Sequence, residues 1–228
     1  MDAQPQARVQ IGIIKVSGPW VWLARLILIG IVAGIAYLFP PLGYWPMWVS
    51  AMGWIAFSVY WGLAAKNAAQ AKSAESARSR RVHEVLTNVG ILLLFLPLPG
   101  LRQSFLPASP AWVPAGLAVL TASVALAIWA RRHLGRYWSG RIEIKTNHEL
   151  VRAGPYRLLR HPIYTAIVGM CAGTALVDGH AHALAGVAVT LFAYWRKVRM
   201  EEAKLRESFG GDYEDYRRAT WGMIPGLF

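Results

Sequence analysis

The amino-acid sequence predicts an all-α protein, a polytopic membrane bundle of about six apolar helices. Of its 228 residues, 55% are hydrophobic and only 16% are charged, and this apolar share exceeds that of ordinary soluble domains. The apolar residues come in long blocks rather than in amphipathic stripes. Because a block of about 20 apolar residues matches the hydrocarbon core of a bilayer, the sequence indicates that lipid is the main solvent.

Residues 1–130 are predicted to form a membrane scaffold of about four spans. Three apolar blocks are the clearest, namely Trp20–Phe39, Trp45–Ala65 and Trp112–Ala130. The fourth, Val85–Leu106, contains two prolines and a glycine within 97–100. Since proline interrupts the hydrogen bonds of a helix, we expect this helix to break there.

Residues 131–228 hold most of the charged side chains, so we expect the chemistry there. Two shorter blocks, Ile163–Val177 and Ala181–Val198, predict a helical hairpin that need not cross the whole bilayer. The polar stretch before them is expected to lie along the interface, with a short extended piece around Ile144. A charged helix follows, ending at Gly210, after which Asp212 is expected to cap a second short helix.

The positions of the Lys and Arg residues predict the orientation of the protein in the membrane. Nearly all Lys and Arg lie near the N-terminus or in 66–84, 131–160 and 196–228. Positively charged short loops stay on the cytoplasmic side, so six crossings would put these segments, both termini and the active site there. Anionic lipid headgroups then account for the net charge of +12 without any nucleic acid. The first apolar block has bilayer length and no convincing cleavage pattern, which favours an anchor over a signal peptide.

The sequence does not support several common kinds of catalytic or metal site. Cys171 is the single cysteine and lies in an apolar block, which favours a buried structural thiol. Asp178, His180 and His182 lie on a short turn, where solvated loop residues are favoured over a metal site, so no metal is predicted. The sequence holds no HExxH, Walker phosphate loop, GxSxG or GxGxxG pattern.

The run GPYRLLRHPIY, residues 154–164, is the first candidate functional segment. Pro162 suits the first turn of a helix, which places His161 just before it at the membrane surface. Arginines and two tyrosines surround this histidine, so a ligand with a carboxylate and an aromatic base would find partners. The structural alternative is that His161 caps its own helix.

Glu201 and Glu202 form the second candidate, just beyond the hairpin and close behind Arg196. The structural alternative is a ladder of ion pairs, because Lys197–Glu201 and Arg199–Glu202 have helical spacing. Ionisable groups beside a membrane interior are costly, however, and are more often functional than charges on a soluble surface.

Together these segments resemble the isoprenylcysteine carboxyl methyltransferase family of integral-membrane enzymes, over roughly residues 131–228. The resemblance rests on three stretches: LGRYWSG at 134–140, HELVRAGPYRLLRHPIY at 148–164 and EEAKLRESFGGDYEDYRR at 201–218. It implies S-adenosylmethionine as cofactor and a lipophilic small molecule or prenylated chain as acceptor. The cofactor contacts that it implies are Tyr156, Arg157, Leu158, Leu159, His161, Tyr164 and Glu202. It further implies Arg196 and Glu201 as the catalytic pair, with the roles of the two glutamates open to exchange.

The residues fit methyl transfer but leave the acceptor open. A carboxylate acceptor is ionised near neutral pH, and Arg196 could hold it bidentately. With an amine or phenol, Glu201 could instead take up a proton. A phospholipid N-methyltransferase, a sterol-type reductase using NADPH and a noncatalytic membrane adaptor are the alternatives. The oligomeric state is not predicted.

Overall fold

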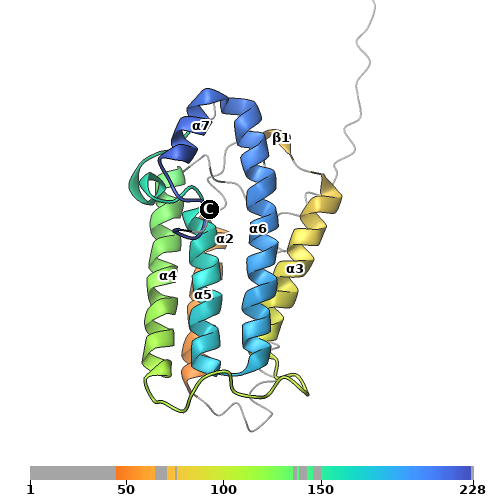
Figure 1. Ribbon diagram of the computed structural model, residues 1–228, viewed down its shortest axis with the longest axis vertical. Coiled ribbons are helices and arrows are strands. Elements are labelled where there is room, and N and C mark those ends of the chain that lie inside the picture. The colour runs from red at the N-terminus through yellow and green to blue at the C-terminus, as the bar shows by residue number, and fades with distance from the viewer. Residues whose placement is uncertain are drawn as a thin grey trace, which may run out of the picture.

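The computed structural model describes residues 45–64, 71–74, 76–135, 138, 143–145 and 150–226. The predicted first span, Trp20–Phe39, lies outside these residues. Within the described residues, five helices run side by side and a sixth, shorter helix crosses one end of the bundle (Figure 1). Their bounds are α2 Trp45–Ala64, α3 Ala77–Phe95, α4 Trp112–Leu134, α5 Pro162–Asp178, α6 Ala181–Phe209 and α7 Gly211–Arg218.

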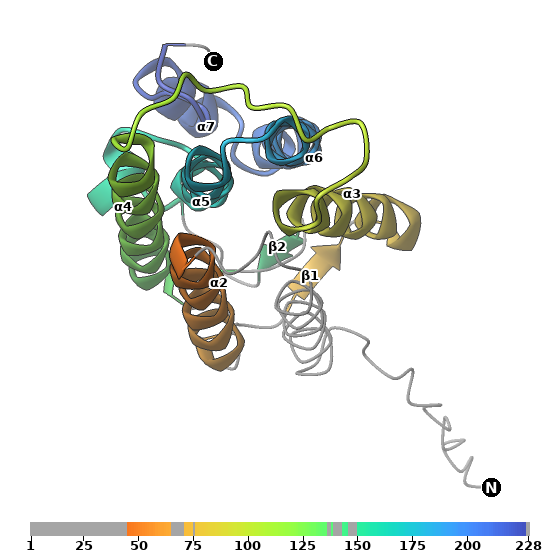
Figure 2. The same cartoon turned by 90° about the horizontal axis from the view of Figure 1, so that it is seen from below.

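Helix α5 is central to the described bundle. Seen along the helices, it lies between α4 and α6, with α3 beside α6 and α2 beside α4 (Figure 2). The loop from α3 to α4 crosses the end of the bundle where α5 passes into α6. The opposite end carries α7 and the C-terminal tail (Figure 1). Each end of α5 is therefore covered by a segment distant in sequence.

Two described helices, α2 and α4, are long and apolar enough to cross a membrane, with mean hydropathies of 1.2 and 1.9. They confirm the predicted blocks Trp45–Ala65 and Trp112–Ala130, although α4 continues to Leu134. Helix α3 ends at Phe95, before the prolines, which confirms the predicted break. It begins earlier than expected, at Ala77, and its first turns are charged. The total of about six spans remains a prediction.

The predicted C-terminal hairpin is present as α5 and α6, and α6 is a single helix of 29 residues that runs well past its apolar part. It ends at Gly210, whose φ of 51° favours glycine. The expectation that Asp212 caps the next helix is wrong. Gly210 already turns the chain, so α7 begins at Gly211 and Asp212 lies in its first turn.

A small sheet qualifies the all-α prediction. Strand β1, Ala71–Ala74, pairs antiparallel with β2, Glu143–Lys145. The extended piece expected around Ile144 is thereby confirmed, and it joins the connector before α3 to the polar stretch after α4. A 3-10 turn, Gly154–Arg157, then leads toward α5.

Helices α4 and α5 approach each other through glycines. A Cβ on Gly116 would lie 2.6 Å from the carbonyl oxygen of Gly173, and one on Gly173 would lie 2.7 Å from that of Gly116. Only a residue without a side chain permits this backbone contact. On the other side, Trp54 Nε1 of α2 donates to Thr174 Oγ1 at 3.0 Å. These contacts fix α5, and therefore the residues at both of its ends.

Candidate functional site

The segment before α5 is paired with the C-terminal tail. Trp221 N donates to Leu158 O at 3.0 Å, and Arg160 N donates back to Trp221 O at 2.8 Å. His161 N then donates to Gly222 O at 3.1 Å. This short ladder, parallel at Leu159 and Trp221, satisfies backbone groups that a buried loop would leave without partners. It sets the position of His161 at the end of the bundle.

His161 occupies the N-cap position of α5, directly before Pro162. Its side chain makes no capping hydrogen bond, so the structural alternative of a self-capping histidine is wrong. The side chain is 5% exposed, and its ring stacks on Tyr164, with the ring centroids 5.4 Å apart. Proline at the first helical position, as predicted, starts α5 directly after His161.

Two carboxylates of α6 approach the imidazole. His161 Nδ1 lies 3.6 Å from Glu201 Oε2, and His161 Nε2 lies 3.4 Å from Glu202 Oε1. His161 Nε2 is buried and lacks a hydrogen-bond partner of good geometry. Since buried polar atoms nearly always have partners, this nitrogen indicates a place that a polar ligand group would complete.

Glu202 is held mainly by Arg160. Arg160 Nε donates to Glu202 Oε1 at 2.8 Å, and the two side chains are 5% and 12% exposed. The same guanidinium donates to the carbonyl oxygens of Arg217, at 3.1 Å, and Thr220. The predicted ladder partner, Arg199, instead lies over the ring of Trp195. Glu202 therefore joins the segment before α5 to α6 and to the tail.

Glu202 lies beyond the apolar part of α6 and is ionised. Burial by itself would raise the pKa of this carboxyl. The polar contact with the His161 ring, together with the hydrogen bond and the charge of Arg160, outweighs burial and lowers the pKa to about 2. At neutral pH this charge is thus already compensated within the protein.

Glu201 is in a different situation. Tyr164 donates its hydroxyl to Glu201 Oε2 at 2.7 Å, and the carboxylate side chain is 29% exposed. Tyr194 and Lys197 lie on the same side of α6, because they precede Glu201 by about two and one helical turns. Their contacts agree, since the Tyr194 ring is 4.9 Å and Lys197 Nζ 5.5 Å from the Tyr164 ring. Glu201 is thus the more accessible of the two carboxylates.

Arg196 points to another side of α6. Its guanidinium donates to Ser79 of α3, to Oγ at 3.0 Å and to the carbonyl oxygen at 3.4 Å. Five residues of α-helix separate it from Glu201 by about 140° around the axis. The structure therefore brings Glu201 to His161 but directs Arg196 toward α3.

The four residues before Arg160 differ in exposure. Tyr156 is buried and its carbonyl oxygen accepts from Tyr216 Oη at 2.7 Å. Leu158 is 69% exposed, and Arg157 is exposed as well. Leu159 is half-buried, and its contribution to the tail ladder comes from its backbone.

The sequence did not predict three residues of the buried polar cluster. Arg160 was expected only as general positive charge, although it holds Glu202. Lys197 was expected in a surface ladder, but it is 6% exposed. Tyr213 of α7 is fully buried and its hydroxyl has no hydrogen-bond partner. The position of Arg160 directly before His161 could have indicated its role, whereas no local sequence pattern predicted that the C-terminal tail packs against this segment.

These features define a class of protein: a bundle of apolar helices with a buried polar cluster at one end. Comparison with known proteins shows what part of the chain is similar to. Residues 116–207 match the model of the isoprenylcysteine carboxyl methyltransferase (ICMT) family. This segment contains α5, His161, Arg196 and both glutamates, so the resemblance inferred from the motifs is confirmed over this part of the chain.

Individual proteins are similar to this chain over part of its length. A probable protein-S-isoprenylcysteine O-methyltransferase from Oryza sativa subsp. indica is 35% identical over 89 residues, which are 37% of this chain and 45% of the rice protein. The nickel-cobalt-cadmium resistance protein NccN from Alcaligenes xylosoxydans xylosoxydans is 32% identical over 123 residues, 51% of this chain and 53% of that protein. The chain thus spans about half the length of these relatives.

The fold has a solved counterpart. The structure of the eukaryotic intramembrane Ras methyltransferase ICMT matches with a TM-score of 0.54 and 18% sequence identity. The match covers 91% of this chain and 76% of that protein. It therefore extends the shared fold beyond the segment that the family model covers.

Proposed function

We propose that the protein is an integral-membrane methyltransferase that transfers a methyl group from S-adenosylmethionine to a lipophilic acceptor, a carboxylate such as that of an isoprenylcysteine. The observation that carries the proposal is the buried, unpartnered Nε2 of His161 beside Glu201 and Glu202. It lies within the segment that matches the methyltransferase family.

The cofactor has chemistry that suits this cluster. Its amino and sulfonium groups are positively charged, and its ribose and adenine carry hydrogen-bonding groups. The backbone from Tyr156 to Leu159, together with His161 and Tyr164, would supply polar and aromatic contacts. Two buried polar atoms without partners, His161 Nε2 and Tyr213 Oη, support a polar ligand in this region.

The two glutamates would have different tasks. Arg160 already compensates Glu202, which makes Glu202 a positioning residue that holds the segment before α5 against α6. Glu201 keeps an accessible carboxylate whose orientation is set by Tyr164. Its charge is therefore the one available to a cationic ligand. This assignment exchanges the roles that the family resemblance implied.

Methyl transfer requires the donor and acceptor to approach in line, so positioning is the main task of the protein. S-adenosylmethionine supplies an electrophilic methyl group on a sulfonium. A carboxylate acceptor is ionised at neutral pH and needs no general base. Arg196 uses one donor from each of two nitrogens for Ser79, and its remaining N–H groups can hold a carboxylate.

The membrane setting supports a lipophilic acceptor. Helices α2 and α4 have the length and composition of membrane spans, and α5, which carries the cluster at its start, packs against both. We place the cluster at the membrane surface on the cytoplasmic side, in a multi-pass protein. An acceptor with a prenyl chain would then enter from lipid while its polar end reaches the cluster.

Turnover with defined acceptors tests the proposal. Purified protein in lipid nanodiscs is incubated with methyl-labelled S-adenosylmethionine and S-farnesylcysteine, and base-labile methyl ester is counted. We expect ester formation, reduced strongly by Glu201→Gln and not by Arg218→Ala, which alters an exposed pair. Label in phospholipid headgroups would support the N-methyltransferase alternative. Oxidation of NADPH without label transfer would support the reductase and contradict the proposal.

A further inference from the structure

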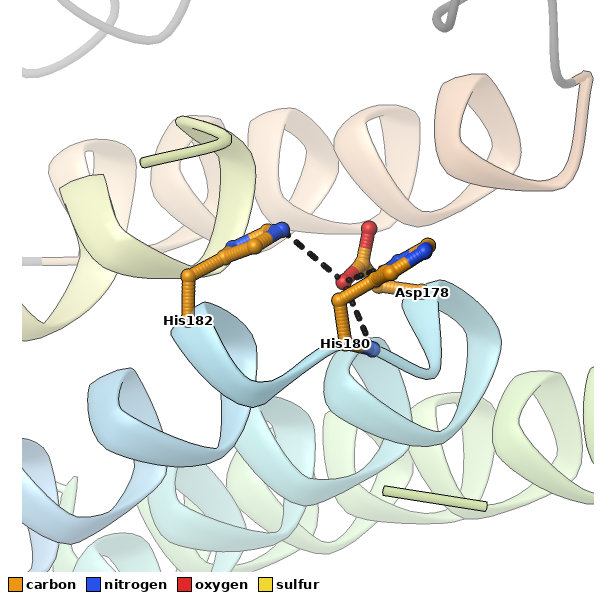
Figure 3. A group of neighbouring side chains, drawn as sticks. All are labelled: Asp178, His180 and His182. Carbon is orange, nitrogen blue, oxygen red and sulfur yellow. Dashed lines mark hydrogen bonds and ion pairs between the residues drawn. The ribbon is translucent and has the colours of Figure 1, made fainter. Parts of the chain in front are cut away.

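A second polar cluster lies at the other end of α5, in the turn to α6. Figure 3 shows Asp178, the last residue of α5, between His180 and His182. Asp178 Oδ2 lies 3.3 Å from His180 Nδ1 and 3.3 Å from His182 Nε2. The 17 residues of α5 separate this turn from His161 by about 25 Å. The two clusters are therefore distinct sites.

The turn is not the solvated loop that its sequence favoured. His182 is 3% exposed, and the side chain of Asp178 is 14% exposed. The loop between α3 and α4 is hydrogen-bonded across the turn, through Phe105 N to Gly179 O and His182 N to Leu101 O, both at 3.0 Å. These bonds fix the backbone that carries the three side chains.

The tautomer of His182 follows from its other contact. His182 Nδ1 lies 2.9 Å from the carbonyl oxygen of Leu93 on α3. A carbonyl can only accept, so Nδ1 carries the proton. In the neutral ring, Nε2 then presents a lone pair to the carboxylate of Asp178. Two lone pairs at this distance require a cation between them, either a proton, held by the ring or by the carboxyl group, or a metal ion.

The arrangement matches that of a metal-binding histidine. Such a ligand almost always donates its other ring nitrogen to a carbonyl or carboxylate, which fixes the orientation of the ring. Leu93 O does this for His182. The three candidate ligand atoms lie within 4.8 Å of one another. Metal–ligand bonds of about 2.0–2.1 Å in a tetrahedron place ligand atoms about 3.4 Å apart, close to the 3.3 Å between Asp178 Oδ2 and each of the two imidazole nitrogens.

We propose that Asp178, His180 and His182 bind one divalent transition-metal ion, best met by Zn²⁺. Two imidazoles and one carboxylate suit Zn²⁺ and its neighbours in the first transition row, rather than Mg²⁺ or Ca²⁺, which prefer oxygen ligands. Three protein ligands leave a position for water, and the side chain of His180, 45% exposed, gives access from solvent. The ion would join the end of α5 to the start of α6.

Metal binding by the full chain tests the proposal. The protein is purified without a polyhistidine tag, stripped with a chelator and dialysed to equilibrium against ZnCl₂, and bound metal is counted per chain. We expect one tightly bound zinc in the wild type, with binding at least about tenfold weaker in His180→Ala and Asp178→Asn. His133→Ala, which changes an exposed histidine of α4, should bind like the wild type, and MgCl₂ should give no binding.

Two further readouts keep the result interpretable. Because the side chain of His180 is partly exposed, His180→Ala should keep the helical circular dichroism and the melting temperature of the wild type in EDTA. Zn²⁺ should raise the melting temperature of the wild type but not that of His180→Ala, since a ligand that binds only the folded state stabilises it. Absence of stoichiometric zinc in the folded wild type, or equal binding by His180→Ala, would overturn the proposal.

Discussion

The two ends of α5 carry polar clusters built in opposite ways. At the start of the helix, Arg160 and His161 contact Glu202, which follows Arg160 by 42 residues in the sequence. The tail around Trp221 is hydrogen-bonded to the same segment. At the end of the helix, Asp178, His180 and His182 come from one turn. The first cluster depends on the tertiary fold, whereas the second is local and is only oriented by its neighbours. The two should therefore respond differently to mutation and pH.

The largest effect should follow from removing Arg160. Arg160→Ala leaves Glu202 as a buried charge without its main partner, and such a loss costs about 3–5 kcal/mol. Chemical or thermal unfolding in detergent measures it. The matched control is Arg218→Ala, whose pair with Asp215 is 76% and 68% exposed and should contribute under about 1 kcal/mol. Equal stability of the two variants would contradict the tertiary role of the cluster.

Acid should weaken the same end of the helix. The pKa of Glu202 is lowered from 4.5 to about 2, so its contribution to stability is present above pH 4.5 and is lost as the pH falls toward 2. The contribution is on the order of 2–3 kcal/mol. The stability difference between wild type and Glu202→Gln should thus be constant near neutrality and shrink below pH 4.5. A difference that grows with acid would contradict this account.

The turn cluster should show smaller, uneven effects in EDTA. His182→Ala removes the buried donor to Leu93 O and should cost about 1–3 kcal/mol. His180→Ala alters a partly exposed side chain and should stay within about 0.5 kcal/mol. Melting temperatures of the two variants measure the contrast. Equal losses would show that the two histidines contribute alike and that the contact to α3 is unimportant.

The same contrast explains what the sequence could predict. Apolar blocks and prolines are local signals, so α2, α4 and the hairpin of α5 and α6 were predictable, as was Pro162 at the start of α5. The motif around His161 pointed to the site because the family resemblance supplied its distant partner. The choice of Arg160 rather than Arg199 as the partner of Glu202 depends on a tail ladder about 60 residues away, which no local pattern encodes.

The solvent exposure of individual side chains was the other property that the sequence could not predict. The spacing of Asp178, His180 and His182 fits a solvated turn equally well, and only the loop between α3 and α4 buries His182. In the same way, helical spacing allowed Lys197 to lie on the surface, while packing of α6 against Tyr164 buries it. Which face of a helix is covered depends on long-range packing.

Cofactor binding by the folded protein tests the central claim most directly. S-adenosylhomocysteine is titrated by calorimetry into the protein in nanodiscs, beside His161→Ala, Glu201→Gln and Glu202→Gln. We predict one saturable site, weakened at least about tenfold by the first two variants, because each loses a charged or buried polar contact. Glu202→Gln should weaken it less, since the amide still accepts from Arg160. A folded wild type without saturable binding, or with binding of NADPH that S-adenosylhomocysteine does not displace, would contradict the account.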